Sequence, residues 1–472
     1  MRNMLRCRRG SAAFATVVAL VPLIGVMALG GEAGSWYVTR QRAQGAADAA
    51  AYSGALRLAC DSAPQPGTTC SNTQTVDWRA KQVAAQNSFC NSGDTSYPGA
   101  TCATSLPAGV SKSVQIATLT SWNGTAGNFV QATVGQQQPT YLAQLLGLST
   151  INVVATAVAG VDSLAKPPCV LALKDAVTFQ GSPKVSSPSC GISSNSTADN
   201  AIGFKGNSGI QVNAPSYTVG GCSQTGGSQC TGVKTYQQPI PNPLSGFDTA
   251  ISSLKTSDFP DGACPVPSTN TPLPAYGSPK KCYYDLSSKV SGAFTSFNNN
   301  SYTLSGIYFF ADGALTIGGN ATITTPSPAT ATLILLPPKF MSPSDNGATL
   351  ALSGNPTIQI SAPSIVLATQ VPAPLASSTV LKLMTDLLIY DPEPWSKKGI
   401  NITGNSSSYF DGTVYVPNTP VTYAGNSSSS APGCYQVIAY AVNFIGDTTL
   451  DNRQCKSDLA ITPNVQTVRL VQ

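Results

Sequence analysis

Residues 8–56, RRGSAAFATVVALVPLIGVMALGGEAGSWYVTRQRAQGAADAAAYSGAL, begin with charge, continue as an apolar run and end in an alanine-rich stretch with few charges. No charged residue occurs from Gly10 to Gly31, a run of 22 residues. A helix rises about 1.5 Å per residue, so a helix of this length covers the hydrocarbon core of a bilayer, which is about 30 Å thick. The stretch therefore predicts a transmembrane helix over residues 10–31.

The charges on either side of this run predict its orientation. Only Arg40 and Arg42 follow it closely, whereas four arginines precede it: Arg2, Arg6, Arg8 and Arg9. The positive-inside rule then makes residues 1–9 a cytoplasmic tail and places the bulk of the chain outside the cytoplasm. We expect a single-pass protein of the inner (cytoplasmic) membrane, with Trp36 and Tyr37 at the outer interface.

A cleavable signal peptide is the alternative interpretation, because Ala28-Leu29-Gly30 fits a small-x-small cleavage site. The apolar run is longer than the usual signal-peptide core of about 7–15 residues. Helix-forming residues also continue from Ala33 to Leu56 without a proline. These two features favour a retained anchor, and both interpretations export the rest of the chain.

Cysteine usage agrees with export. Of the thirteen cysteines, Cys7 lies in the predicted cytoplasmic tail and the other twelve lie in the exported part. Pairing of neighbours would give Cys60–Cys70, Cys90–Cys102, Cys169–Cys190, Cys222–Cys230, Cys264–Cys282 and Cys434–Cys455. The sequence leaves this connectivity open. A zinc site is the competing interpretation, but the chain has no C-x-x-C and no histidine.

Composition bounds the class of protein. The 472 residues include 42 glycines and 35 prolines, only 10% are charged, and valine, isoleucine and threonine are frequent. This profile favours a long, β-rich chain of several domains. Because histidine is absent, the commonest general base and metal ligand is missing. No basic stripe indicates nucleic acid. We therefore expect no enzyme activity and assign no catalytic, cofactor-binding or metal-binding residues.

The opening stretch resembles the N-terminal region of TadG-like Flp (tight-adherence) pilus-assembly proteins. The matching residues are Arg9-Gly10, Glu32 where the family usually has Asp, Trp36-Tyr37, Arg40 to Arg42, Gln44 and the block Ala47 to Ala51. The resemblance implies a membrane-anchored, pilin-like α+β domain. It also implies a non-catalytic envelope protein that takes part in assembling or anchoring a Flp/Tad-type pilus. Its partners would be the membrane and other pilus-assembly or pilin-like proteins.

The alanine-rich stretch predicts a flat helix face. Five of its alanines recur at intervals of three and four residues and so share one side of a helix: Ala43, Ala46, Ala47, Ala50 and Ala51. Small side chains allow another element to approach closely. Two partners remain open, namely a second predicted helix over residues 73–89 of the same domain, or a pilin-like protein in the membrane.

Residues 32–162 read as one extracytoplasmic domain of mixed structure. The stretches SVQIATLTSW and NFVQATVG alternate apolar and polar residues, as half-buried strands do. TYLAQLLGLS reads as a short helix, and INVVATAVAGV as a more buried strand. We expect a small α+β domain built on the anchor helix.

Residues 163–472 read as a mainly-β domain. An apolar residue, a spacer, Gly and then Asn, Ser or Asp recur at Gly181, Gly206, Gly319, Gly354, Gly404, Gly425 and Gly446. A turn that recurs at about the length of one coil predicts a parallel β-helix-like solenoid. CVLAL, ATLILL, SIVLAT and QVIAYAVNF would be its inward-facing strands. A sandwich or an irregular β fold is the alternative.

Residues 222–300 interrupt this rhythm. They contain the proline-rich PIPNPLSGFDTAISSL and the stretch CPVPSTNTPLPAYGSPKKC. We interpret them as a disulfide-pinned insertion that forms lateral loops.

A second functional class rests on acidic residues. Solenoids of this kind include enzymes that cleave polysaccharides with paired acids, so an envelope protein that binds or cleaves carbohydrate is the alternative function. The candidate acids are Asp391 and Glu393 in YDPEPW and Asp411 in YFDGTVY, all near aromatic residues, although acids next to proline and glycine ordinarily form turns. The stretch DLSSK at Asp285 ends in Lys289 and so lacks the Asp-x-Ser-x-Ser pattern of a metal-dependent adhesion site.

Overall fold

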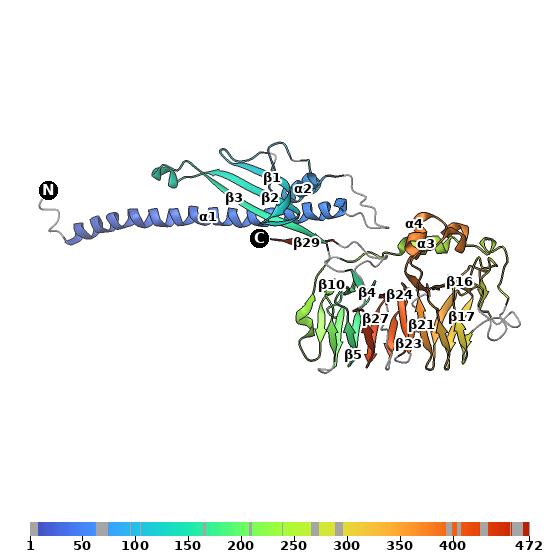
Figure 1. The fold of residues 1–472 in the computed structure, drawn as a ribbon. Helices are drawn as coiled ribbons and strands as arrows, with labels where there is room; N and C mark the ends of the chain where they lie inside the picture. The colour runs from blue at the N-terminus through green and yellow to red at the C-terminus, as the bar shows by residue number, and fades with distance from the viewer. Residues whose placement is uncertain are drawn as a thin grey trace. The chain divides into compact units, whose positions relative to one another are not determined.

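The computed structural model describes residues 8–471, except 63–73, 95, 104, 164–166, 207–209, 238, 266–272, 288–295, 393–398, 404–406, 425–432, 454 and 456–465. A long N-terminal helix and a mainly-β region with parallel sheets dominate the fold (Figure 1). The described residues divide into two compact units. Unit 1 holds the chain up to residue 163 and again from residue 466, and unit 2 holds residues 164–465.

Unit 1 is one sheet with two helices. Helix α1 (Arg8–Ser62) runs for 55 residues with Pro22 inside it, and α2 (Val76–Gln86) follows. The antiparallel sheet has the order β1-β2-β3-β29. Its strands are β1 (Ser111–Trp122), β2 (Thr125–Pro139), β3 (Thr150–Ser163) and β29 (Gln466–Leu470), with the short helix η2 (Ala143–Leu146) between β2 and β3. The predicted helices and strands of this domain thus occur close to their expected positions.

The strand β29 changes the expected domain boundary. We expected residues 163–472 to form the second domain, but residues 466–470 pair with β3 of unit 1. Val468 packs against the apolar core of unit 1, and this contact stabilises the strand in unit 1 rather than in the β-rich region. Unit 2 is therefore inserted in the chain between two neighbouring strands of unit 1.

Unit 2 contains four sheets, and the strand pairs among its described residues are parallel. The largest has the order β12 (Val233–Lys234), β10 (Ser216–Thr218), β7 (Gly191–Ser194), β4 (Pro168–Ala172), β26 (Tyr435–Ala439), β24 (Tyr409–Val416), β22 (Leu387–Tyr390), β19 (Ala331–Leu335), β16 (Gly306–Ala311) and β13 (Tyr284–Asp285). Joined to it through β24 are β21 (Thr357–Ser361), β18 (Thr322–Thr324) and β15 (Ser301–Thr303).

The other three sheets are smaller. One has the order β11 (Cys222–Gln224), β8 (Ile202–Lys205), β5 (Val177–Gly181), β27 (Val442–Gly446), β25 (Val421–Ala424) and β23 (Ile400–Thr403). The second is β14 (Ser296–Asn298), β17 (Gly313–Gly318) and β20 (Ala348–Leu352), and the third is β28 (Thr449–Asp451), β6 (Lys184–Ser186) and β9 (Gln211–Asn213). Consecutive strands such as β4, β5 and β6 go to three different sheets, and β7, β8 and β9 repeat the same order one position along.

The chain enters the largest sheet in its middle. From β4 it proceeds through β7 and β10 to the edge strand β12, and it next joins this sheet at the opposite edge, in β13. It then returns through β16, β19, β22 and β24 to β26, which pairs with β4. Across the sheet in Figure 1, green strands are therefore followed by red, then orange and then yellow ones, so the last strands of the chain lie between earlier ones.

This route corrects the interpretation of residues 222–300 as lateral loops. Residues 222–224 and 233–234 are still strands of the sheets, and the described parts of 235–283 carry the chain from one sheet edge to the other. These parts include α3 (Ser245–Ser252) and η4 (Thr256–Asp258), and η3 (Gln229–Gly232) precedes them. Phe247, Ile251 and Phe259 pack against the largest sheet, so the segment covers a face that would otherwise be exposed.

That cover explains the continuous apolar strands. In β19, Leu333 and Leu335 face the inner core, while Ile334 faces the core shared with the crossing segment. Strands buried on both faces read as unbroken apolar runs, as ATLILL and CVLAL do. The prediction for SIVLAT was wrong. Its Ile365 and Leu367 are exposed, because only Val366 reaches the core shared with the crossing segment. The segment ends in η5 (Ala368–Gln370). The elements η6 (Ala373–Leu375) and α4 (Ser378–Met384) complete the same core.

The recurring glycines mark strand ends that lie on one another. Gly446 pairs with Gly181, and both have positive φ, 84° and 93°. A Cβ on Gly181 would lie 3.1 Å from the backbone of Gly446. Glycine is thus required here both for its backbone conformation and for the close approach of the chains. Gly404 and Gly425 lie outside the described residues.

Candidate functional site

The alanine face of α1 lies inside unit 1. Ala43, Ala46, Ala47, Ala50 and Ala51 are each at most 1% exposed. They share a core with Ala80 and Ala84 of α2 and with two rows of small residues on the sheet, Val130, Ala132 and Val134 of β2 and Ala155, Ala157 and Ala159 of β3. The unit's own second helix and sheet therefore cover this face.

Small residues on both sides allow this close packing. Gly54, one turn beyond Ala50, is so tightly packed that a Cβ there would lie 2.9 Å from Val130 Cγ1 and 3.2 Å from Ala80 Cβ. Each alanine buries only about one methyl group, so the stability of the contact depends on the number of close contacts rather than on the area per residue. Larger side chains on this face would push the helix off the sheet.

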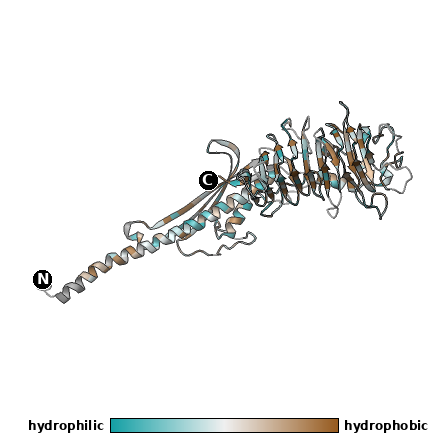
Figure 2. Ribbon diagram, turned by 90° about the horizontal axis from the view of Figure 1, so that it is seen from below, coloured by the Kyte–Doolittle hydropathy of each residue, from teal (hydrophilic) through white to brown (hydrophobic). Residues whose placement is uncertain are grey.

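The N-terminal part of α1 is different in character. By length and composition, α1 contains a stretch within Ala15–Asp61 that is able to cross a membrane. Val17, Val18, Leu20 and Leu23 are exposed, and Figure 2 shows apolar turns in this part of the helix. The same helix thus presents an exposed apolar part followed by a buried alanine face.

Glu32, the first charged residue after the apolar run, binds the loop between β2 and β3. Its Oε1 accepts a hydrogen bond from the backbone N–H of Tyr141 at 2.7 Å, and its Oε2 accepts from those of Leu142 and Ala143 at 3.1 Å each. These N–H groups lie at the start of η2, where a helix has unsatisfied donors. The sequence offered one signal for this contact, an acid placed directly after an apolar span, but nothing in it indicated which residues Glu32 would contact.

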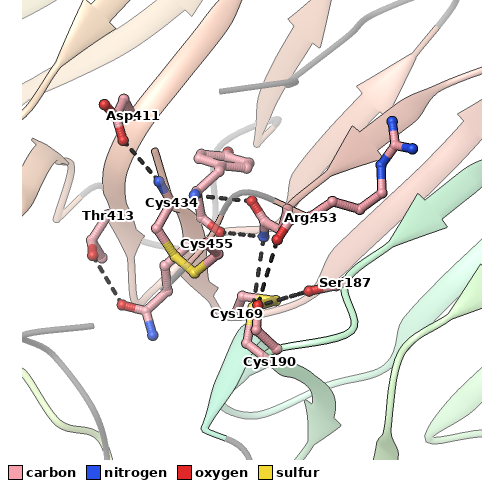
Figure 3. The surroundings of a disulfide bond; sticks show 12 residues. Cys169, Ser187, Cys190, Asp411, Thr413, Cys434, Arg453 and Cys455 are labelled. Atoms are coloured by element: carbon pink, nitrogen blue, oxygen red, sulfur yellow. Dashed lines mark hydrogen bonds between the residues drawn. A yellow bond between two sulfur atoms is a disulfide. The ribbon is translucent and has the colours of Figure 1, made fainter. Parts of the chain in front are cut away.

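Two disulfides lie side by side where β26 meets β4. The bonds Cys169–Cys190 and Cys434–Cys455 occupy one buried cluster (Figure 3). The Sγ atoms of Cys190, Cys434 and Cys455 lie within 4.8 Å of one another. A metal ion would require these sulfurs as thiolates, whereas the disulfides leave them without that charge.

Polar side chains complete this junction. Gln436 Nε2 donates to the Pro168 carbonyl at 2.8 Å, and its Oε1 accepts from Thr413 Oγ1 at 2.9 Å. Asn452 Nδ2 donates to the Tyr435 carbonyl at 2.7 Å, and its Oδ1 accepts from the Tyr435 N–H at 3.0 Å. The residues that join the returning chain to β4 are therefore buried and hydrogen-bonded as well as covalently linked.

Three other disulfides whose cysteines both lie in the described part of the chain also join neighbouring cysteines. They are Cys90–Cys102, Cys222–Cys230 and Cys264–Cys282. Cys70, the expected partner of Cys60, and Cys7 lie outside the described residues.

The two described acids that were considered for carbohydrate chemistry each bind backbone N–H groups rather than each other. Asp391 is fully buried, and its Oδ2 accepts from the Leu350 N–H at 2.8 Å and from Thr349 Oγ1 at 3.2 Å. Asp411 Oδ1 accepts from the Cys434 N–H at 2.9 Å, and burial raises the pKa of its carboxyl group. Glu393 lies outside the described residues. Asp391 and Asp411 thus both hold neighbouring backbone in place.

A partly buried acid that sequence reasoning missed joins the crossing segment to the sheet. Asp248 of α3 accepts hydrogen bonds from Tyr415 Oη at 2.5 Å, from Tyr390 Oη at 3.1 Å and from Asn242 Nδ2 at 3.4 Å. Burial raises the pKa of Asp248, while these three donors act in the opposite direction. The sequence signal was weak, since one acid in a short helix usually faces solvent.

Tyr415→Phe is expected to destabilise unit 2 by about 1.5–3 kcal/mol, the usual contribution of a hydrogen bond to a charged group. The raised pKa means that the folded state binds a proton more readily than the unfolded state does, so stability should fall as pH rises from the usual aspartate pKa through the raised value. Asp248→Asn should remove this component of the pH dependence. Denaturant unfolding of the full chain at several pH values measures both effects, with Tyr236→Phe, at an exposed tyrosine, as the control. Equal stability of Tyr415→Phe and the control would contradict the assignment.

Comparison with known proteins identifies the kind of segment at the N-terminus. The long helix α1 combines an exposed apolar part, then Glu32, and then a buried alanine face. The family model described as Putative Flp pilus-assembly TadE/G-like matches residues 10–57, so this chain carries a TadE/G-like segment at its N-terminus. No curated protein matches the chain, and no solved structure matches it.

Proposed function

We propose that this protein takes part in assembling or anchoring a Flp/Tad-type pilus and that it acts by binding rather than by catalysis. One observation carries the proposal. The family match, residues 10–57, falls entirely within α1 and spans both its apolar part and its alanine face. The part of the chain that resembles pilus-assembly proteins is therefore the part that combines the span with the core of unit 1.

The proposed location is the inner membrane, with residues 1–9 in the cytoplasm, residues 10–31 in the bilayer, and unit 2 and the rest of unit 1 outside. The four arginines before the span support this orientation through the positive-inside rule. The disulfides support it independently, because such bonds persist in oxidising compartments and are rare in the cytoplasm. Pilin-like or other pilus-assembly proteins are the proposed partners.

For unit 2 we propose a parallel β-helix-like solenoid. The support is the repeated assignment of consecutive strands to three sheets, together with the parallel register of β4 with β7, β5 with β8 and β6 with β9. A solenoid offers a long lateral surface for a binding partner. The backbone contacts of Asp391 and Asp411 favour such a binding role over cleavage of carbohydrate.

Replacing Ala47 and Ala51 with leucine is expected to reduce pilus formation strongly while the protein still inserts in the membrane. Overpacking a close-packed core costs about 1–3 kcal/mol per site, and both alanines are fully buried. Pili counted by electron microscopy in a deletion strain complemented with the variant give the result, and membrane fractionation checks insertion. Gln41→Leu, on the exposed side of the same helix, is the matched control. Normal pilus numbers in the double variant, or in the deletion strain itself, would contradict the proposal.

A further inference from the structure

The loop between β2 and β3 is apolar although it is exposed. Residues 140–149, TYLAQLLGLS, contain no charge. Tyr141 is 78% exposed and Leu148 is 57% exposed. Loops of soluble domains run over the surface in contact with water, where apolar side chains gain nothing, and exposed apolar groups that lie together mark contact sites.

The loop has a defined conformation. The Thr140 N–H donates to the Ser149 carbonyl at 3.2 Å, directly after the last strand pair, Pro139 with Thr150. The turn of η2 ends at Gly147, whose φ is 88°. Its exposed apolar side chains are therefore carried by an ordered turn, and three of its backbone N–H groups are held by Glu32.

Glu32 fixes the height of this loop along α1. It is the residue after Gly31, where the uncharged run ends, and so lies about 1.5 Å further along the helix axis. The polar zone of a bilayer extends about 5–8 Å beyond the hydrocarbon on each side. Figure 1 shows the β2–β3 end reaching back along α1 toward its N-terminal part. A loop bonded to Glu32 lies within this polar zone when the run from Gly10 to Gly31 spans the bilayer.

We propose that the β2–β3 loop is a second membrane contact, which inserts Tyr141 and Leu148 into the interface of the bilayer beside the anchor helix. The proposal rests on the proposed anchoring by α1. Tyrosine prefers this interface because its ring is apolar and its hydroxyl is polar, and leucine gains by leaving water. The absence of charge in the loop removes the desolvation cost that a polar loop would incur. With two contacts, unit 1 has a fixed orientation on the membrane surface rather than a single flexible attachment.

Quenching of tryptophan fluorescence by lipids brominated on their acyl chains tests this contact. The full chain is reconstituted in phosphatidylcholine vesicles with Trp36→Phe as the common background. Three reporters are compared with that background: Tyr141→Trp in the loop, Leu20→Trp in the span and Thr120→Trp near the opposite end of the sheet. The Tyr141→Trp reporter is expected to be quenched several-fold more than the Thr120→Trp reporter and to approach the Leu20→Trp reporter.

Adding Glu32→Ala to Tyr141→Trp removes the acceptor of the three loop N–H groups, so quenching of that reporter should fall. The same change should leave the Leu20→Trp reporter unaffected. If Leu20→Trp is quenched but Tyr141→Trp behaves like Thr120→Trp, the loop faces water or another protein chain, and the membrane contact is overturned while the anchor stands. If neither reporter is quenched, the proposed anchor fails and the loop contact fails with it.

Discussion

Leu20→Arg combined with Leu23→Arg is expected to abolish stable membrane association of the full chain. Each arginine near the centre of a span costs about 2.5–3.5 kcal/mol on insertion scales. The apolar residues that remain in the run would no longer offset the penalty of two arginines. Both leucines are exposed on α1, so the substitutions remove no described packing within unit 1. Alkaline extraction of membranes followed by centrifugation measures the loss, which should move most of the protein from pellet to supernatant.

The matched control replaces the same residues with isoleucine, which preserves volume and apolar character and should leave the protein in the pellet. An arginine variant that also stays in the pellet would show that the association does not depend on this span. Sequencing the N-terminus of the mature protein separates the anchor from a cleaved signal peptide. A mature chain that starts at Gly31 would lack the span and would contradict the retained anchor.

Replacing Cys169, Cys190, Cys434 and Cys455 with alanine is expected to unfold unit 2 under conditions in which the native chain is stable. Each pair closes a separation of 21 residues, which contributes about 3 kcal/mol in the chain-entropy model. Two such losses, about 6 kcal/mol together, equal the stability of a domain at the lower end of the usual range of about 5–15 kcal/mol. Protease resistance and denaturant unfolding of the full chain measure the effect.

Cys222→Ala with Cys230→Ala is the control for this variant, since that pair closes only 8 residues near a sheet edge and should lose less stability. Thiol counting in denaturant without reductant should find about one free thiol in the native chain, Cys7, if the other twelve cysteines are all paired. Many free thiols, or a quadruple variant as stable as the control, would exclude a stabilising role for the junction disulfides.

The sequence predicted the features that depend on neighbouring residues. The alanine face followed from intervals of three and four residues, and the strands of unit 1 followed from their alternation. The glycines at strand ends followed from turn chemistry, and the structure brings Gly181 and Gly446 together. These features are local because each requires only a few consecutive residues to adopt a particular backbone conformation.

The features that the sequence did not predict depend on contacts across long separations. Nothing in residues 235–283 indicates that they lead to the far edge of a sheet. Phe247 and Phe259 are equally apolar whether the segment forms a lateral loop or covers a face of the sheet. Glu32 and Tyr141 are 109 residues apart, and their contact depends on the length of β2. SIVLAT does not form a strand because only one of its apolar residues has an apolar partner in the fold. Composition does not specify which residues will have such partners.

The position of β29 has a consequence for the order in which the protein is made. Its partner β3 is synthesised before unit 2, and β29 follows only after residue 465. While unit 2 is being synthesised, the side of β3 that later bonds to β29 is an open sheet edge, and open edges pair readily with other chains. The pairing that closes this edge of unit 1 therefore requires residues that are synthesised after unit 2. Any strand-like segment present during that interval competes with β29 for the same edge.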